Sequence, residues 1–397
     1  MSKKLAILSS YDVICGNAAF SERLIKSINE SNSGWKAFPV DLNLNLNQNI
    51  GKLEVKAADR NFEEIASKLR EFDAVNIQFE AGLYGILPSH VKRRLKKVLT
   101  ANPKTFITYH SPRTTTNFKP RKDAIRFALR GRLIKAVASE LDYFRLNFDV
   151  RMNRQIIKLL KSNDIPVVVH TTRSKDLLSF VFGLKDVHAH PIIFAEKTNI
   201  NYEKSKSILN NLGLPSNRKL VGLFGFISKY KGHMEALDAL ERLPSEYMFV
   251  IAGRIHPQSL GNPDASKYVQ KLMKKISTKP GLSDRVKFVG ELNDEQFQDL
   301  VAAVDCCLLP YHEVGQDGSG IASLCFEVGK RVVASNSYAF DELVRLVPGY
   351  KTYRFDIENY IEMATQIELA VNSNTSLPGT KQFTLESQSK LYLSLSE

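Results

Sequence analysis

The 397-residue sequence is poor in cysteine and has no long apolar run and no low-complexity tract. No stretch approaches the roughly 20 apolar residues that a membrane-spanning helix needs. The apolar run over 5–8 is far too short for the core of a secretion signal, so we expect a cytoplasmic protein. The four cysteines show no metal-binding spacing, which favours reduced, buried thiols and gives no metal site.

The sequence does contain an alternation of strand-like and helical segments, which is typical of parallel sheets covered by helices on both faces. The pattern restarts at Lys219 after a polar stretch, and 397 residues suit two domains better than one. We predict a Rossmann-like domain over 1–194, a linker over 195–218, a second such domain over 219–370, and a tail over 371–397 that returns to the first domain. Strands are expected at 4–10, 72–80, 105–110, 165–171, 219–227, 247–253, 286–292, 304–311 and 331–335.

Acidic residues are scarce between residues 88 and 165. This region holds 19 Lys or Arg against 5 Asp or Glu, a net charge of +14, whereas the whole chain carries +13. Apolar residues recur among the charges from Ile125 to Phe144, a mixture that indicates an amphipathic helix on an anionic membrane or against an acidic acceptor. A solvated helix face without a role is the alternative, and no nucleic-acid-binding motif is present. The expected membrane-docking residues are Arg121, Lys122, Arg126, Arg130 and Arg132.

In parallel α/β folds, ligands bind at the carboxyl ends of the strands, where loops lead into helices. The loop over 9–24 carries Gly16 and Asn17 just before an expected helix, whose N-terminus attracts phosphate. Gly16 would let the backbone approach a ligand, whereas a turn glycine with an Asn cap is the structural alternative. The loop is no GxGxxG fingerprint, which argues against a classical dinucleotide dehydrogenase.

Two further loops each carry one candidate side chain. His110 follows an expected strand, where a histidine can donate to a developing anion or orient a hydroxyl group. A structural histidine bonded to a neighbouring loop is the alternative. Lys231 stands before Gly232 at the start of an expected helix, where it can neutralise a diphosphate leaving group. A surface lysine before a helix is the alternative there.

The glycine-rich segment GQDGSG over 315–320 precedes a helix expected at about 321–328. Such a segment forms a good anion cradle. Gly329 is expected to end the helix as a C-cap. Carboxylates near this loop can hold ribose hydroxyls, and the candidates are Asp317 and Glu327, with Glu313 as a lesser one.

Together these motifs resemble the retaining glycosyltransferases of family 4, which have the GT-B fold. The segment GFISKYKG resembles the family's strand, glycine, spacer and Lys-Gly pair, and VIAG, VKFVGELNDEQFQDLVAAVD, LPY and GKRVVAS follow in the family's order. In the first half, VNIQFEAGLYG and TYHSP resemble the acceptor-side and histidine loops, and VHTTRSKDLL with a later His-Pro pair resembles the end of the first domain. The resemblance covers almost the whole chain.

The resemblance implies two Rossmann-like doubly wound domains facing across a cleft, with a nucleotide sugar in the second and a glycan or lipid-linked acceptor in the first. It implies hexose transfer with retention, as in surface polysaccharide synthesis, without metal or cofactor. The basic region over 88–165, and not the resemblance, places the protein on the inner face of the plasma membrane. GDP-mannose is the first donor that the resemblance suggests. By position, His110 and Lys231 are the expected catalytic residues, Glu80 and Arg113 lie on the acceptor side, and the donor-binding residues are Gly16, Asn17, Lys231, Gln316, Asp317, Gly318, Ser319, Gly320 and Glu327.

The sequence departs from the family at two glutamates that commonly lie eight positions apart around the glycine loop. Alignment on Gly329 puts Gln316 and Leu324 at these positions. The second glutamate usually holds the nucleotide ribose, and Glu327, one helical turn further on, is a possible substitute. Leu324 therefore favours an alternative function, in which the chain is a non-catalytic GT-B subunit that binds and stabilises a partner glycosyltransferase.

Overall fold

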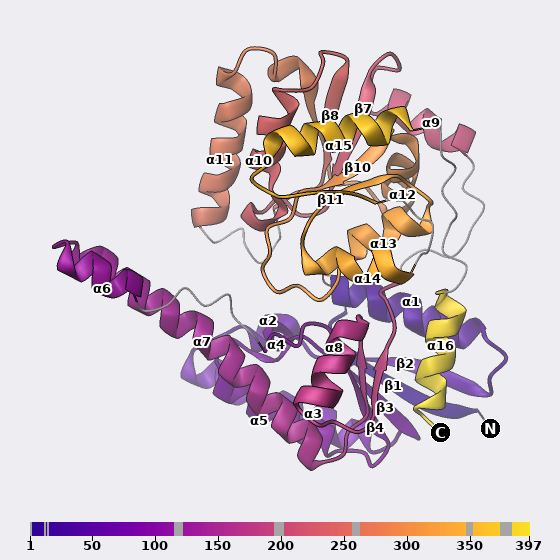
Figure 1. The fold of residues 1–397 in the computed structure, drawn as a ribbon. Coiled ribbons are helices and arrows are strands. Elements are labelled where there is room, and N and C mark those ends of the chain that lie inside the picture. Colours follow the sequence, from indigo (N-terminus) through magenta and orange to yellow (C-terminus); the bar gives the residue numbers. More distant parts are fainter. Residues whose placement is uncertain are drawn as a thin grey trace. The chain divides into compact units, whose positions relative to one another are not determined.

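We analysed a computed structural model that describes residues 2–11, 13, 16–114, 122–193, 202–255, 263–346, 352–373 and 383–397. The side chains of residues 122, 123, 141–149, 202–204 and 346 are outside this description. The chain divides into two compact units (Figure 1). The first unit is Met1–His190 with Glu386–Glu397, and the second is Pro191–Leu385.

The first unit is built on a parallel sheet of six strands in the order β2-β1-β3-β4-β5-β6. The central strand β3 is buried at every position, as expected for a parallel strand covered on both faces. The strands are β1 (Lys3–Ser9), β2 (Trp35–Asp41), β3 (Ala74–Phe79), β4 (Thr105–Tyr109), β5 (Val167–Val169) and β6 (Val187–Ala189). The helices are α1 (Gly16–Glu30), α2 (Leu44–Asn47), α3 (Lys52–Leu69), α4 (Ala81–Tyr84), α5 (Pro88–Leu99), α6 (Lys122–Leu129), α7 (Leu133–Ser162), α8 (Thr172–Asp176) and α16 (Leu385–Ser394).

The second unit is also built on a sheet of six parallel strands, in the order β12-β11-β10-β7-β8-β9. Alternate side chains of β7 and β8 enter two hydrophobic clusters, because successive residues of a strand point to opposite faces. The strands are β7 (Lys219–Phe224), β8 (Tyr247–Ala252), β9 (Val286–Gly290), β10 (Cys306–Leu309), β11 (Val332–Ser335) and β12 (Tyr353–Phe355). The helices are α9 (Tyr202–Asn211), α10 (His233–Leu240), α11 (Pro263–Thr278), α12 (Asp294–Ala303), α13 (Gly320–Glu327), α14 (Tyr338–Leu346) and α15 (Tyr360–Asn372).

All nine predicted strands are present, and the structure adds β2, β6 and β12, which the sequence analysis missed. β2 contains Pro39 and has exposed positions, which hid it as a strand; it lies at the edge of its sheet, where proline is tolerated. β6 and β12 are three residues long, too short for a periodic signal.

The range predicted as a linker, 195–218, contains helix α9, which packs against α12. Ile208 and Leu214 are buried in a core cluster of the second unit, so this part of the range belongs to that unit. Its polar composition concealed these apolar positions. Residues 195–201 lie outside the described part of the chain.

The end of the chain belongs to the first unit from Glu386 onward, and α15 keeps residues 371 and 372 in the second unit. On α16, the Tyr392 hydroxyl lies 2.7 Å from Thr108 Oγ1 of β4, and the Tyr392 ring packs edge-on against Phe106. Ser389 donates a hydrogen bond to Ser27 of α1. The last helix is therefore fixed to the sheet and to α1 of the first unit.

Within the described residues, no helix is both long enough and apolar enough to cross a membrane. The three described cysteines, Cys306, Cys307 and Cys325, are buried and free of disulfides. Cys15 lies outside the described part of the chain.

Candidate functional site

In the second unit, Lys231 ends a 3-10 turn over Lys229–Lys231 that follows β7 and leads into α10. The next residue, Gly232, has φ +69°, and a Cβ atom built there would lie 1.8 Å from the Pro310 carbonyl oxygen. Only glycine allows this approach, and the His312 amide adds a hydrogen bond to the Tyr230 carbonyl. The loops after β7 and β10 are therefore held tightly together, with Lys231 between them.

The Lys231 side chain is only 6% exposed. Its ammonium group donates a hydrogen bond to the Tyr311 hydroxyl and lies 3.8 Å from the centre of the Tyr311 ring. Among the described residues, no carboxylate lies within ion-pair distance of this ammonium group. Burial lowers the pKa of Lys231 to about 7. The structure therefore excludes the alternative of an ordinary surface lysine.

The glycine-rich loop after β10 leads into α13, and Ser319 caps this helix by accepting a hydrogen bond from the Ala322 amide. The Tyr311 hydroxyl lies 3.3 Å from Ser319 Oγ, so the cap and Lys231 share one partner. Gly320 is the first residue of α13. The N-terminus of α13 thus lies close to the buried lysine, and binding of a donor phosphate there stays a prediction.

The other loop residues have different surroundings. Asp317 is buried, and Gln316 and Gly318 are partly exposed. Leu324 is buried in a core cluster of the second unit, and Glu327 is half-buried. Gly329 has φ +65° and ends α13, as predicted.

Glu313 has a structural role. Its carboxylate accepts hydrogen bonds from the Gly315 amide, the Ser337 hydroxyl and the Tyr338 amide. It therefore fixes the glycine-rich loop to the start of α14.

In the first unit, His110 follows β4, as predicted, and both of its ring nitrogens have protein partners. Nε2 lies 2.7 Å from Gln78 Oε1, and Nδ1 lies 2.8 Å from Nε2 of His170. His170 Nδ1 lies 3.2 Å from the His190 carbonyl oxygen, and the Phe20 ring packs edge-on against both histidines. This is the arrangement of a histidine bonded to neighbouring strands; contact with a transferred sugar stays a prediction.

The sequence analysis did not single out His170 or Gln78. His170 follows β5 directly, so the rule that selected His110 also applies to it. Gln78 lies inside β3, where its amide donates to Asn76 Oδ1 at 2.6 Å. The polar residues inside the otherwise apolar strand β3 were the signal from which this hydrogen-bond network could have been predicted.

Acid should destabilise the first unit through these two rings. Burial lowers the pKa of His170 to about 4 and holds the pKa of His110 well below its usual value. Below about pH 6.5 the unfolded chain binds protons that the folded chain does not, so stability falls as pH falls from 6.5 to 4. His170 alone should account for on the order of 3 kcal/mol.

Urea unfolding of the protein between pH 8 and 4.5 checks this prediction. The single tryptophan, Trp35, is buried in β2, so its fluorescence reports on the first unit. In His170→Gln the decrease should be shallower than in the wild type. A wild-type stability that stays constant between pH 6.5 and 5 contradicts the prediction.

Gly16 is the first residue of α1, and a Cβ atom built on it would meet nothing within 4 Å. Asn17 is partly exposed, and its carbonyl oxygen accepts a hydrogen bond from Ser21. The space around Gly16 is therefore open, and its proposed approach to donor phosphates stays a prediction.

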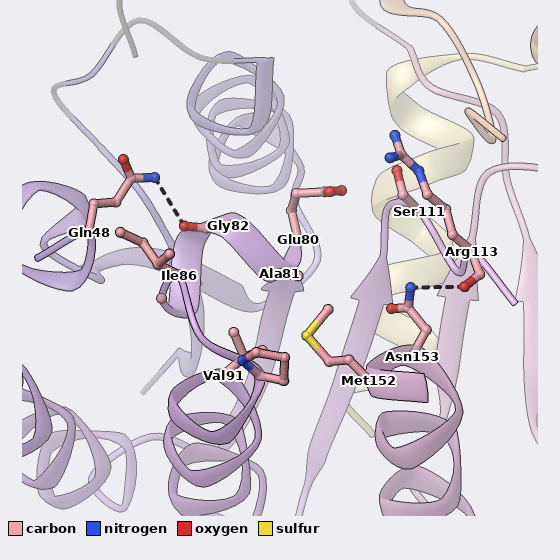
Figure 2. A pocket seen from close by; sticks show the side chains of 12 residues that line it. Gln48, Glu80, Ala81, Gly82, Ile86, Val91, Ser111, Arg113, Met152 and Asn153 are labelled. Carbon is pink, nitrogen blue, oxygen red and sulfur yellow. Dashed lines mark hydrogen bonds between the residues drawn. The ribbon is translucent and has the colours of Figure 1, made fainter. Parts of the chain in front are cut away.

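A pocket of about 340 Å³ opens in the first unit beside the carboxyl ends of β3 and β4 (Figure 2). The predicted acceptor-side residues Glu80 and Arg113 both line it, together with Ser111. Ile86, Val91 and Met152 add apolar side chains to its lining. A ligand with hydroxyl groups on one edge and an apolar face suits this lining.

The polar wall of the pocket is built on fixed loops. Asn153 of α7 donates to the Arg113 carbonyl oxygen at 2.9 Å and accepts from the Tyr109 hydroxyl. Removal from water raises the pKa of the Glu80 carboxyl, while the Arg113 guanidinium and a hydrogen bond from Ser111 oppose this shift. Glu80 and Arg113 are thus electrostatically coupled.

The basic region over 88–165 divides into two parts. On α5, Arg93 and Arg94 both pair with Asp59, and Lys97 pairs with Glu63; both acids belong to α3. Arg94 is fully buried. The charge count therefore overstated the free positive charge of this region, because these three cations are paired with acids of α3.

The second part covers the end of α6, the residues after it and the start of α7, over 125–137, and is called the α6–α7 turn. Both basic and apolar side chains are exposed there. Arg126, Arg130 and Arg132 are exposed, and α6 packs against α7 (Figure 1). Docking of these residues on a membrane stays a prediction. Of the other predicted docking residues, Arg121 and the Lys122 side chain lie outside the described part. The exposed aliphatic residues are Ile125, Leu129, Leu133, Ile134 and Val137.

A comparison with protein families finds a match within the second unit. Residues 204–380 match the model of the family described as glycosyl transferases group 1. No curated protein sequence matches the chain. Among the described residues, no group of three or more His, Cys, Asp or Glu side chains is arranged to hold a metal ion.

Solved structures match almost the whole chain. HepE of Anabaena, in complex with UDP and glucose, matches with a TM-score of 0.61 at 16% identity, covering 99% of this chain and 97% of HepE. The chain has the GT-B fold. Sucrose-phosphate synthase of Thermosynechococcus elongatus gives 0.65 at 14% identity, covering 99% and 96%. WaaG, a glycosyltransferase involved in lipopolysaccharide biosynthesis, gives 0.56 at 12% identity, covering 98% and 99%.

This GT-B chain thus consists of two Rossmann-like units, as the sequence analysis predicted. The family match falls on the unit that contains Lys231 and the glycine-rich loop. At these low identities the solved structures establish the fold alone.

Proposed function

We propose that this GT-B chain is a retaining glycosyltransferase of family 4 that moves a hexose from a nucleotide sugar to a glycan or lipid-linked glycan. The observation that carries the proposal is the buried Lys231 beside the N-terminus of α13, inside the unit that matches the glycosyl transferase family. A cation and the N-terminus of a helix converge there, and among the described residues no carboxylate lies within ion-pair distance of the cation. A departing diphosphate is the group that such a site stabilises.

The proposal is tested by incubating the protein with a panel of nucleotide sugars and measuring the release of nucleoside diphosphate. GDP-mannose is the first donor to test, because of the sequence resemblance, and UDP-glucose is the second, because the HepE complex contains it. Release from one donor, increased by an added glycan acceptor, supports the proposal. Binding without release from any donor favours the alternative function.

The alternative, a non-catalytic subunit that stabilises a partner glycosyltransferase, is favoured by Leu324. Its burial in the hydrophobic core means that this position offers no group for a ribose hydroxyl. Glu327, half-buried on the same helix, is proposed to supply that contact. Loss of nucleoside diphosphate release in Glu327→Gln supports the enzyme, because a subunit that only stabilises a partner releases no nucleoside diphosphate.

We propose that the pocket lined by Glu80 and Arg113 binds a sugar of the acceptor. Glu80→Gln should raise the acceptor KM about tenfold, because a carboxylate binds sugar hydroxyls more strongly than a neutral amide does. The donor KM should stay unchanged. The matched control is Glu71→Gln, an exposed carboxylate before the same strand. A change confined to the donor KM would assign Glu80 to another site.

The exposed α6–α7 turn is proposed to dock the first unit on an anionic bilayer at the inner face of the plasma membrane. Each basic residue near such a surface contributes about 1 kcal/mol, and the exposed aliphatic residues add shallow insertion. Docking of this kind would bring the first unit to a lipid-linked acceptor.

Charge reversal of Arg126, Arg130 and Arg132 to Glu should abolish sedimentation with vesicles that contain anionic lipid. Wild-type binding should rise with the anionic fraction and weaken in high salt, because salt screens surface charge. Reversal of Lys92 and Lys96, exposed lysines of α5, is the matched control and should have a smaller effect. Equal wild-type binding to neutral and anionic vesicles contradicts the proposal and favours an acidic acceptor.

A further inference from the structure

Tyr311, the second residue after β10, has contacts that its place in the sequence did not reveal. Its carbonyl oxygen accepts a hydrogen bond from Ser335 Oγ at 2.6 Å, and its ring packs against Phe340 at 4.9 Å between centroids. These contacts fix the backbone and the ring. The hydroxyl then accepts from Lys231 and lies 3.3 Å from Ser319 Oγ.

The ring of Tyr311 also contacts the Lys231 ammonium group, by a cation–π interaction. At 3.8 Å from the ring centre, Lys231 Nζ lies well within cation–π distance, whereas the Tyr230 ring is at 5.3 Å. A Cβ atom built on Gly225 would lie 3.3 Å from the Ile321 side chain and 3.9 Å from this Nζ, so Gly225 and Ile321 of α13 lie beside the ammonium group.

We propose that Tyr311 is a positioning residue that holds the Lys231 ammonium group beside the N-terminus of α13 for the diphosphate of a nucleotide. The inference rests on the proposed function, because it concerns the same donor site. It goes further by assigning the hydroxyl and the ring of Tyr311 to that site. Tyr311 acts through Lys231 and Ser319 and needs no contact with the nucleotide itself.

The arrangement makes nucleotide binding dependent on pH. In the described part of the chain, the titratable groups recorded around Lys231, besides Tyr311, are Tyr230, His233 and Cys325. Burial lowers the pKa of His233 to about 4, so this ring is neutral at neutral pH. With its own pKa at about 7, the Lys231 amine takes up a proton from solvent when a diphosphate brings negative charge.

The first measurement is the affinity of the wild-type protein for UDP and for GDP between pH 6 and 9, by isothermal titration calorimetry. Affinity should fall by up to tenfold per pH unit above about pH 7, because the free amine must then be protonated on binding. Calorimetry in buffers of different ionisation enthalpy should show net proton uptake near pH 8. In Lys231→Arg the uptake should be absent, because the guanidinium is always charged.

The second measurement uses Tyr311→Phe, which keeps the ring and removes the hydroxyl. Affinity at pH 7 should fall about tenfold or more, since a hydrogen bond to a charged group is lost. The pH at which affinity begins to fall should move lower, because the ammonium loses an acceptor. A purely structural role would leave this pH unchanged.

The matched control is Tyr247→Phe, at the opposite end of the same sheet, where Lys219 lies 4.9 Å above the tyrosine ring. It should bind nucleotide as the wild type does. Tyr311→Phe with wild-type affinity and pH dependence overturns the proposal, as does a wild-type affinity that is constant from pH 6 to 9. No binding of UDP or GDP by the wild-type protein would count against the proposed function instead.

Discussion

Replacement of Lys231 by Ala should reduce turnover by about 10²–10³ at saturating donor. One preorganised charge that stabilises a leaving group typically contributes this much. The fold should survive, because no carboxylate among the described residues depends on Lys231 for charge compensation. Steady-state release of nucleoside diphosphate measures the loss, and a circular dichroism melt verifies the fold.

The matched control for this prediction is Lys229→Ala. Lys229 belongs to the same 3-10 turn but is exposed. Its removal should leave turnover within about twofold of the wild type, since exposed charges are screened by solvent. Equal activity of both variants would show that Lys231 does not contact the leaving group.

Arg94→Ala should destabilise the first unit by about 3–5 kcal/mol, the usual cost of removing one partner from a buried ion pair. The Arg94 side chain is fully buried, and its Nε donates to Asp59 Oδ1 at 2.8 Å. Its Nη1 donates to the Tyr84 carbonyl oxygen at 2.9 Å. Removal therefore leaves the Tyr84 carbonyl oxygen without this partner in the interior, and it leaves the partly exposed Asp59 carboxylate paired with Arg93 alone.

Arg93→Ala provides the control, because Arg93 pairs with the same carboxylate from the surface. Its side chain is 43% exposed, so the variant should lose less than about 1 kcal/mol. Urea unfolding followed by Trp35 fluorescence measures both variants in the first unit. Equal losses would mean that burial does not distinguish the two arginines.

These neighbouring arginines show where the sequence alone could not distinguish roles. The pattern of α5 places basic residues at successive positions, and charge counting treats them as equal. Only packing against α3 puts Arg94 inside and Arg93 outside, because their shared partner, Asp59, lies 34 and 35 residues earlier in the chain. Helix α9 was missed for a related reason: its apolar positions became visible only once α12 lay against them.

Part of the candidate site could likewise be predicted from the sequence, and part is shown only by the structure. The position of Lys231 before a helix and the glycine loop before α13 could be predicted, because strand-to-helix loops follow directly from the order of elements. The burial of Lys231 could not, since it depends on Tyr311, 80 residues further along the chain. Likewise His110 was found at the end of β4, but its pairing with His170 required β4 and β5 to lie side by side.

The sequence by itself determined the parallel α/β architecture, the restart of the pattern at Lys219 and the loops that lie at strand ends. Local periodicity and composition carry this information, because neighbouring residues form each strand, turn and helix end. The tertiary structure alone decided which cations are bound internally and which are exposed, and which side chains surround Lys231 and His110. Those contacts join residues from different loops and helices, so their energies depend on burial and distance that no local pattern contains.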